Sequence, residues 1–150
     1  GNLENFVTTW RTDNSGQSED DQITIPTHPG SIYDYDVYWE NVNGPGVDGA
    51  IANNTGSLTI DFGAPGTYRV EISGVFPRIQ FFDPDAAEGN QAIDPLKILT
   101  VEQWGAIEWT SMQHAFHGAE NLRLAAADAP YLSAVDDLSF MFFGASSCYF

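Results

Sequence analysis

The sequence predicts a mainly β protein. It indicates an antiparallel β-sandwich over residues 1–77, followed by the first turns of a β/α solenoid over residues 78–150. In the first part, short stretches alternate apolar and polar side chains between turn residues, which is typical of antiparallel strands. In the second part a pattern recurs after 26 residues. A period of roughly 20–29 residues is typical of leucine-rich-type solenoids.

Composition agrees with an ordered protein that has a substantial core. The chain has 150 residues, of which 43% are hydrophobic and 13% aromatic. Disordered chains lack this much apolar surface, so they are excluded. The 14 Gly and 8 Pro follow no period, which also excludes collagen and coiled coil. A chain of this length forms one ordinary domain or two small ones.

Five strands are expected in the first part because each stretch alternates apolar and polar residues or is rich in β-branched and aromatic residues. They cover residues 6–12, 22–27, 32–40, 57–61 and 67–73. Residues 13–21 form a polar loop, and residues 41–56 a long loop or a weak hairpin. In the strand at 32–40, Trp39 shares the inward face with Tyr35 and Val37, whereas Tyr38 falls on the polar face.

The second part begins with a short apolar strand at 78–82 and an acidic loop at 83–95. Residues 110–119 then match residues 136–145 at an offset of 26. The apolar residues of the first copy are spaced i, i+3, i+4, i+7, which predicts a short helix in each copy. Gly118 suits a left-handed cap at the helix end.

These residues resemble a known combination. The pattern at 112–119 and 138–145, with the lead-in ILTVEQWG at 98–105, resembles the 26-residue repeat of BspA-like leucine-rich-repeat bacterial surface proteins. The strands YDVYW (35–39) and DFGAPGTYRV (61–70) resemble an Ig-like, PKD-type module that often precedes such arrays. The resemblance implies a secreted or surface-displayed bacterial protein of adhesive or binding type, with no catalytic residues to carry over.

Charge and cysteine content exclude several classes. With 21 acidic and 5 basic side chains the net charge is −16. Nucleic acid and anionic membranes are therefore not expected as partners, because both require clustered Lys and Arg. No apolar stretch is long enough to insert into a membrane. The single cysteine, Cys148, allows no internal disulfide.

No catalytic, cofactor or metal site is predicted. The chain has no G-x-S-x-G, H-E-x-x-H or P-loop motif. The G-x-G-x-x-G at 44–49 lacks a following helix and is interpreted as a loop. Cys148 lies too close to the chain end to be well supported as a nucleophile. The acidic clusters at 19–21 and 83–94 are interpreted as solvated, with Ca²⁺ binding as the alternative.

The expected function is non-catalytic adhesion or protein binding at a bacterial cell surface or outside the cell, with a protein or matrix ligand as partner. The alternative is a carbohydrate-binding module of a secreted polymer-degrading system. The candidate contact residues are Phe140, Phe143, His114, His117 and Tyr38. The histidines occupy the repeat positions of the two phenylalanines, and Tyr38 is the candidate for stacking on a glycan. The apolar last repeat predicts self-association, or a longer array of which this chain is a part.

Overall fold

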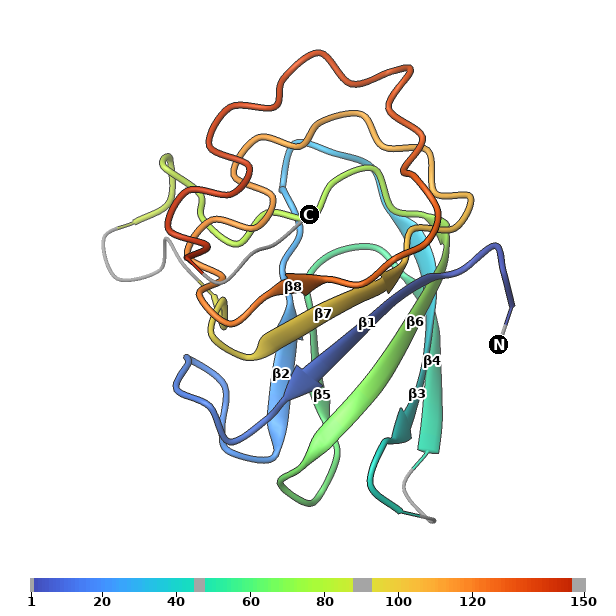
Figure 1. The fold of residues 1–150 in the computed structure, drawn as a ribbon, viewed down its shortest axis with the longest axis vertical. Helices are drawn as coiled ribbons and strands as arrows, with labels where there is room; N and C mark the ends of the chain where they lie inside the picture. Colours follow the sequence, from blue (N-terminus) through green and yellow to red (C-terminus); the bar gives the residue numbers. More distant parts are fainter. Residues whose placement is uncertain (1, 45–47, 88–92, 147–150) are drawn as a thin grey trace.

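The computed structural model describes residues 2–44, 48–87 and 93–146, and within them the protein is mainly β, without helices. The described residues form eight strands, which follow one another in sequence (Figure 1). They are β1 (Phe6–Arg11), β2 (Gln22–Ile25), β3 (Asp34–Asn41), β4 (Asp48–Asn54), β5 (Leu58–Asp61), β6 (Thr67–Val75), β7 (Ile98–Gln103) and β8 (Arg123–Leu124).

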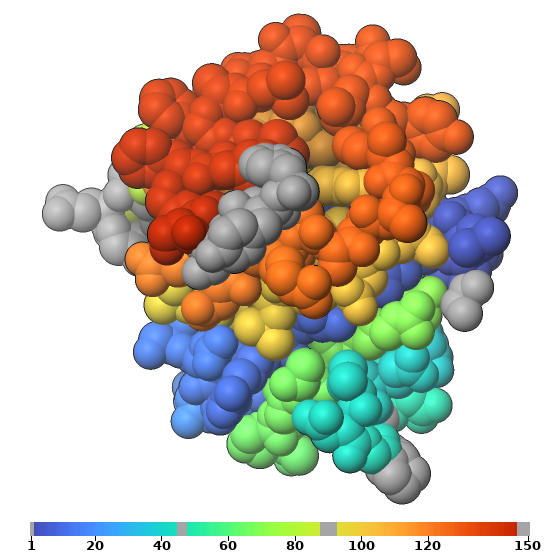
Figure 2. Space-filling view, viewed as in Figure 1, coloured from blue at the N-terminus to red at the C-terminus, as the bar shows by residue number. Residues whose placement is uncertain are grey.

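The strands form one large mixed sheet and one small sheet. The large sheet has six strands in the order β4-β3-β6-β1-β7-β8, and β2 pairs with β5 in the small sheet. All pairs are antiparallel except β7 and β8, which run parallel. Because β1 lies between β6 and β7, the two parts of the chain share one sheet. Residues beyond 98, yellow to red in Figure 2, occupy one end of the molecule.

Alternation along β3 places its side chains as expected. Tyr35 and Val37 are buried and Trp39 is 9% exposed, whereas Tyr38 is 41% exposed. The strand register predicted for this segment is therefore confirmed. Trp39 meets the ring of Phe62 edge to face at 5.7 Å. Such inward-facing aromatic side chains dominate the core, because each buries a large apolar area.

The core continues from the strands into the second part of the chain. Phe6 on β1 stacks on Trp104, with ring centroids 5.7 Å apart. Phe6 also meets Trp109 edge to face at 5.0 Å. Buried residues from both parts of the chain belong to one hydrophobic cluster.

Of the two alternatives predicted for residues 41–56, the hairpin is confirmed, because this segment contains β4, which pairs with β3. The strand predicted at 78–82 needs correction. The segment 78–82 is not a strand among the described residues, although Ile79 and Phe81 are buried as an apolar strand would be. These side chains pack into the core while the carbonyl of Pro77, just before the segment, accepts a hydrogen bond from Thr110 N–H at 2.9 Å.

The predicted helices at 110–119 and 136–145 are wrong. Each segment is a run of successive turns, which we call turn unit 1 (residues 112–119) and turn unit 2 (residues 138–145). Positive φ angles interrupt any helix: His114 (54°) and Gly118 (76°) in unit 1, Phe140 (56°) and Gly144 (75°) in unit 2. A left-handed residue at every fourth position closes turns but cannot propagate a right-handed helix.

Candidate functional site

The two turn units stack on each other through their backbones. In unit 1 the N–H groups of Met112, His114, Phe116 and Gly118 donate to the carbonyls of Asp137, Ser139, Met141 and Phe143 at 2.7–3.0 Å. The intervening N–H groups close turns within unit 1, from Ala115, His117 and Ala119 to the carbonyls of Met112, His114 and Phe116. Alternate backbone donors therefore serve the turns and the neighbouring unit, whereas an α-helix would use them all internally.

Rings stack in register with the backbone. Phe116 lies over Phe142 at 5.8 Å and His114 over Phe140 at 4.9 Å, with planes within 10° of parallel in each pair. His117 and Phe143 are 4.8 Å apart. Each pair is separated by 26 residues, so the sequence offset places the same position of successive units one above the other.

The ring stacks continue below unit 1. Phe82 stacks on His117 at 4.3 Å, with an angle of 15° between the planes. Phe81 is 6.4 Å from Phe116. The apolar residues just before the acidic loop therefore act as the layer on which the first unit rests.

His114 and His117 form a hydrogen-bonded pair. Their Nδ1 atoms are 2.9 Å apart, so one ring donates and the other accepts. Burial lowers the pKa of both histidines below the ordinary value, because it disfavours the charged form. The pair lies between the ring of Phe82 on one side and the rings of Phe140 and Phe143 on the other.

Turn unit 2 leaves an apolar surface uncovered, which we call the end face. Leu138, Phe140 and Phe143 are 55%, 56% and 58% exposed. At the matching positions of unit 1, Met112 and His114 are buried, because unit 2 covers them. The N–H groups of Leu138, Phe140 and Gly144 have no backbone partner among the described residues. The end face thus presents rings and hydrogen-bond donors together.

Tyr38 lies apart from the turn units, on β3. Its half-exposed ring borders a hollow of about 240 Å³ that Asp36 and Glu71 also line. Partial burial raises the pKa of the Tyr38 hydroxyl. The structure therefore brings four of the five predicted contact residues together and places the fifth on the sheet.

The acidic loop is not uniformly solvated as predicted, because one of its carboxylates, that of Asp94, is buried and hydrogen-bonded; we call this carboxylate the anchor. Asp94 is fully buried, and its carboxylate accepts from the N–H groups of Gln17, Ser18 and Thr24 at 2.7–3.0 Å. Fully buried Lys97 donates to the carbonyls of Ser18, Glu19 and Gln22 at 2.8–3.0 Å. No local pattern marks this arrangement, because the partners are backbone groups at least seventy residues away in sequence.

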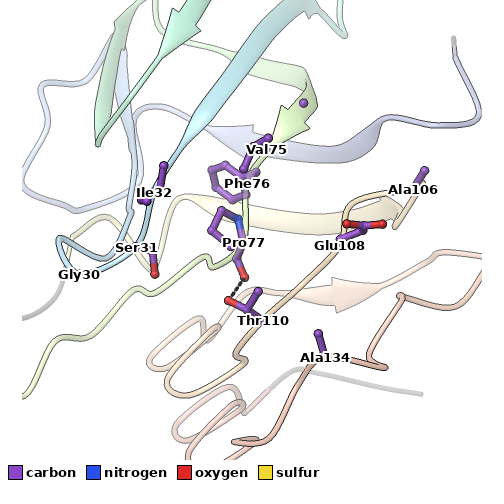
Figure 3. A pocket seen from close by; sticks show the side chains of 11 residues that line it. Gly30, Ser31, Ile32, Val75, Phe76, Pro77, Ala106, Glu108, Thr110 and Ala134 are labelled. Carbon is purple, nitrogen blue, oxygen red and sulfur yellow. Dashed lines mark hydrogen bonds between the residues drawn. The ribbon is translucent and has the colours of Figure 1, made fainter.

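A concave surface, which we call the junction groove, lies between the end of β6, the segment before β3 and the segments that follow β7 and β8 (Figure 3). It consists of two adjoining hollows of about 610 and 430 Å³ that share Ala106, Glu108 and Ala134. The first is also lined by Ile32 and Val75, and the second by Tyr131. Its lining comes from chain segments far apart in sequence, so no linear motif marked it.

The described residues contain no cluster of three His, Cys, Asp or Glu side chains that could hold a metal ion. No helix in the described part of the chain is long and apolar enough to cross a membrane. Cys148 and part of the 44–49 motif lie outside the described residues. Comparison of the chain with protein families, with curated proteins and with solved structures finds no match.

Proposed function

We propose that this chain is a non-catalytic protein-binding module of a secreted or surface-displayed bacterial protein. In this proposal residues 1–77 form an Ig-like cap and spacer, and residues 78–150 begin a leucine-rich-type repeat array. Its partner is a protein or matrix ligand.

The observation that carries the proposal is the stacking of the two turn units. They share the same pair of left-handed positions and the same turn-closing hydrogen bonds, in which every second N–H donates to the carbonyl three residues earlier. In the sequence, β8 lies between turn unit 1 and turn unit 2. It pairs in parallel with β7 and so adds one strand to the large sheet. Units that bury their apolar faces against neighbours are the physical basis of solenoid arrays.

The end face favours head-to-tail association of copies over a two-fold contact. Within the described part of the chain, the backbone groups of this face that lack a backbone partner are the N–H groups of Leu138, Phe140 and Gly144, and the unit 2 carbonyls of Met141 and Phe143 already accept from unit 1. A two-fold contact between two copies of this face would oppose donors to donors. Self-association through it therefore requires a head-to-tail arrangement, in which the incoming segment supplies carbonyls.

A binding experiment tests the proposed function. The purified chain is titrated onto immobilised collagen, fibronectin and mucin, each before and after enzymatic deglycosylation. We expect saturable binding to at least one protein, unchanged by removal of its glycans. Absence of saturable binding to every protein in the set would refute the proposal in this form.

Carbohydrate binding is the second candidate, and the surroundings of Tyr38 favour it. A half-exposed ring beside two acidic side chains offers a stacking platform with hydrogen-bond acceptors for hydroxyl groups. On a glycan array, saturable binding to one glycan that is lost in Tyr38→Ala would support this candidate. Binding that survives Tyr38→Ala would exclude this site.

A further inference from the structure

We infer that the junction groove binds an extended segment of a partner protein in which a lysine or arginine is flanked by apolar side chains. The inference rests on the proposed protein-binding function and names the site and the chemistry of the partner.

The groove has uncovered apolar walls. Ile32 is 86% exposed, Val75 54% and Tyr131 59%. Figure 3 shows Ile32 and Val75 projecting from two different chain segments at the first hollow. Exposed apolar side chains gathered around a concavity mark interaction sites more often than isolated ones do. A ligand with apolar side chains would remove these walls from water.

One charged group lies in this apolar setting. Glu108 is the sole charged side chain among the residues that line the two hollows, and it belongs to both. Its side chain is exposed and has no ion-pair partner within the described part of the chain. A carboxylate beside apolar walls favours a cation whose stem is apolar, which is the chemistry of lysine and arginine.

None of the chain's five Lys and Arg side chains lines the groove. Arg11 pairs with Asp13 at 2.9 Å, and Arg69 pairs with Glu40 at 3.2 Å. Arg78 donates to Gln80, and the amine of buried Lys97 donates to three carbonyls. Arg123, the fifth basic residue, lies on β8, outside the residues that line the groove. A cation for Glu108 must therefore come from a partner, and the net charge of −16 would attract it.

The shape favours a peptide over a compact ligand. Two hollows share one central side of Ala106, Glu108 and Ala134, so a ligand that fills both is extended and passes Glu108 at its middle. The wall behind them is fixed, because the Thr110 N–H donates to the Pro77 carbonyl at 2.9 Å. The exposed walls of the first hollow, Ile32 and Val75, suit aliphatic side chains, whereas Tyr131 in the second hollow is an exposed ring on which a sugar could also stack.

A peptide array provides the test. The probes are immobilised peptides of the frame Val-Ser-X-Ser-Ile, with each of the twenty amino acids at X, so that X and the two apolar residues share one face of an extended chain. We expect the labelled protein to bind peptides with Lys or Arg at X at least fivefold more than those with Gln or Asp. Raising NaCl from about 0.05 to 0.5 M should reduce that preference, since salt screens exposed charges.

Two variants locate the binding site. Glu108→Gln should abolish the preference for Lys and Arg, whereas Glu102→Gln, an exposed acid on β7 outside the groove, should retain it. Val75→Asn, which removes an apolar wall without adding charge, should weaken binding of every peptide. Absence of a preference for basic residues, or a preference that survives Glu108→Gln, would overturn the inference. So would binding of neutral oligosaccharides alone that is lost in Tyr131→Ala.

The matrix-protein titration separates this inference from the proposed function. If Glu108→Gln leaves binding to an immobilised protein unchanged and the array shows no basic preference, the groove inference fails and the protein-binding function stands. If no protein is bound in any form, the proposed function itself fails.

Discussion

The two phenylalanines at equivalent positions of the turn units offer a matched test of the stacking. Phe116 is fully buried and packs against Phe81, Trp104 and Phe142, with ring centroids 5.8–6.4 Å apart. Phe142 occupies the same position one unit later and is only partly buried. Replacing each with alanine removes the same atoms from two layers that differ in what covers them.

The expected magnitudes differ by at least a factor of two. Phe116→Ala should cost about 4–5 kcal/mol, near the upper end for a Phe→Ala change in a core, because a cavity remains and three ring contacts are lost. Phe142→Ala should cost about 1–2 kcal/mol, because its side chain keeps part of its surface in water. Neither change alters charge or touches a strand.

Urea unfolding, followed by the fluorescence of the four tryptophans, measures both losses. The midpoints should fall in the order wild type, Phe142→Ala, Phe116→Ala, with similar m-values. Equal losses, or a larger loss for Phe142→Ala, would refute the assignment of Phe116 to a covered layer and Phe142 to the outer one.

Three further outcomes are expected. As the pH falls below about 6.5, the histidine pair should lose its contribution to stability, because its lowered pKa values let the unfolded chain take up protons first. The double variant His114→Phe and His117→Phe should remove that part of the acid slope in thermal melts, and an unchanged slope would contradict it. Raising NaCl from about 10 to 300 mM should raise the melting temperature by screening the net charge of −16, whereas a flat profile would contradict this. Asp94→Ala should cost about 3–5 kcal/mol, because it leaves several buried donors without acceptors, and exposed Asp20→Ala should change unfolding little; equal effects would argue against the anchor.

Strands were predictable where alternation reflects burial on one face of a sheet. The alternation at 32–40 correctly placed Trp39 inward and Tyr38 outward, because successive side chains of a strand point to opposite faces. The 26-residue offset also paired His114 with Phe140, which stack in the structure.

The turn units show where the same reasoning fails. Apolar residues spaced i, i+3, i+4, i+7 describe a helical face, but the same spacing arises from successive turns that direct every third or fourth side chain inward. Gly118 was interpreted as a helix cap, whereas it is one of two left-handed positions in the unit. The other, His114, carries a bulky side chain that gives no sign of a positive φ.

Long-range polar contacts and the junction groove left no local signal. Asp94 and Lys97 appear in the sequence as ordinary charged residues, and only the fold brings backbone groups of residues 17–24 to them. Val75 ends β6 and Glu108 follows β7, so only the fold brings these two residues to the same hollow.

Extending the stack tests the central claim most directly. A second copy of residues 120–145 is inserted after Ala145, and hydrogen exchange of the Leu138, Phe140 and Gly144 amides is compared with that in the original chain. If the end face accepts a further unit through the N–H groups that have no backbone partner among the described residues, these amides should exchange at least tenfold more slowly and the midpoint of urea unfolding should rise. Insertion of a scrambled copy of the same composition should produce neither change. Unchanged exchange at these amides, with the true copy cleaved by protease as readily as the scrambled one, would contradict the account.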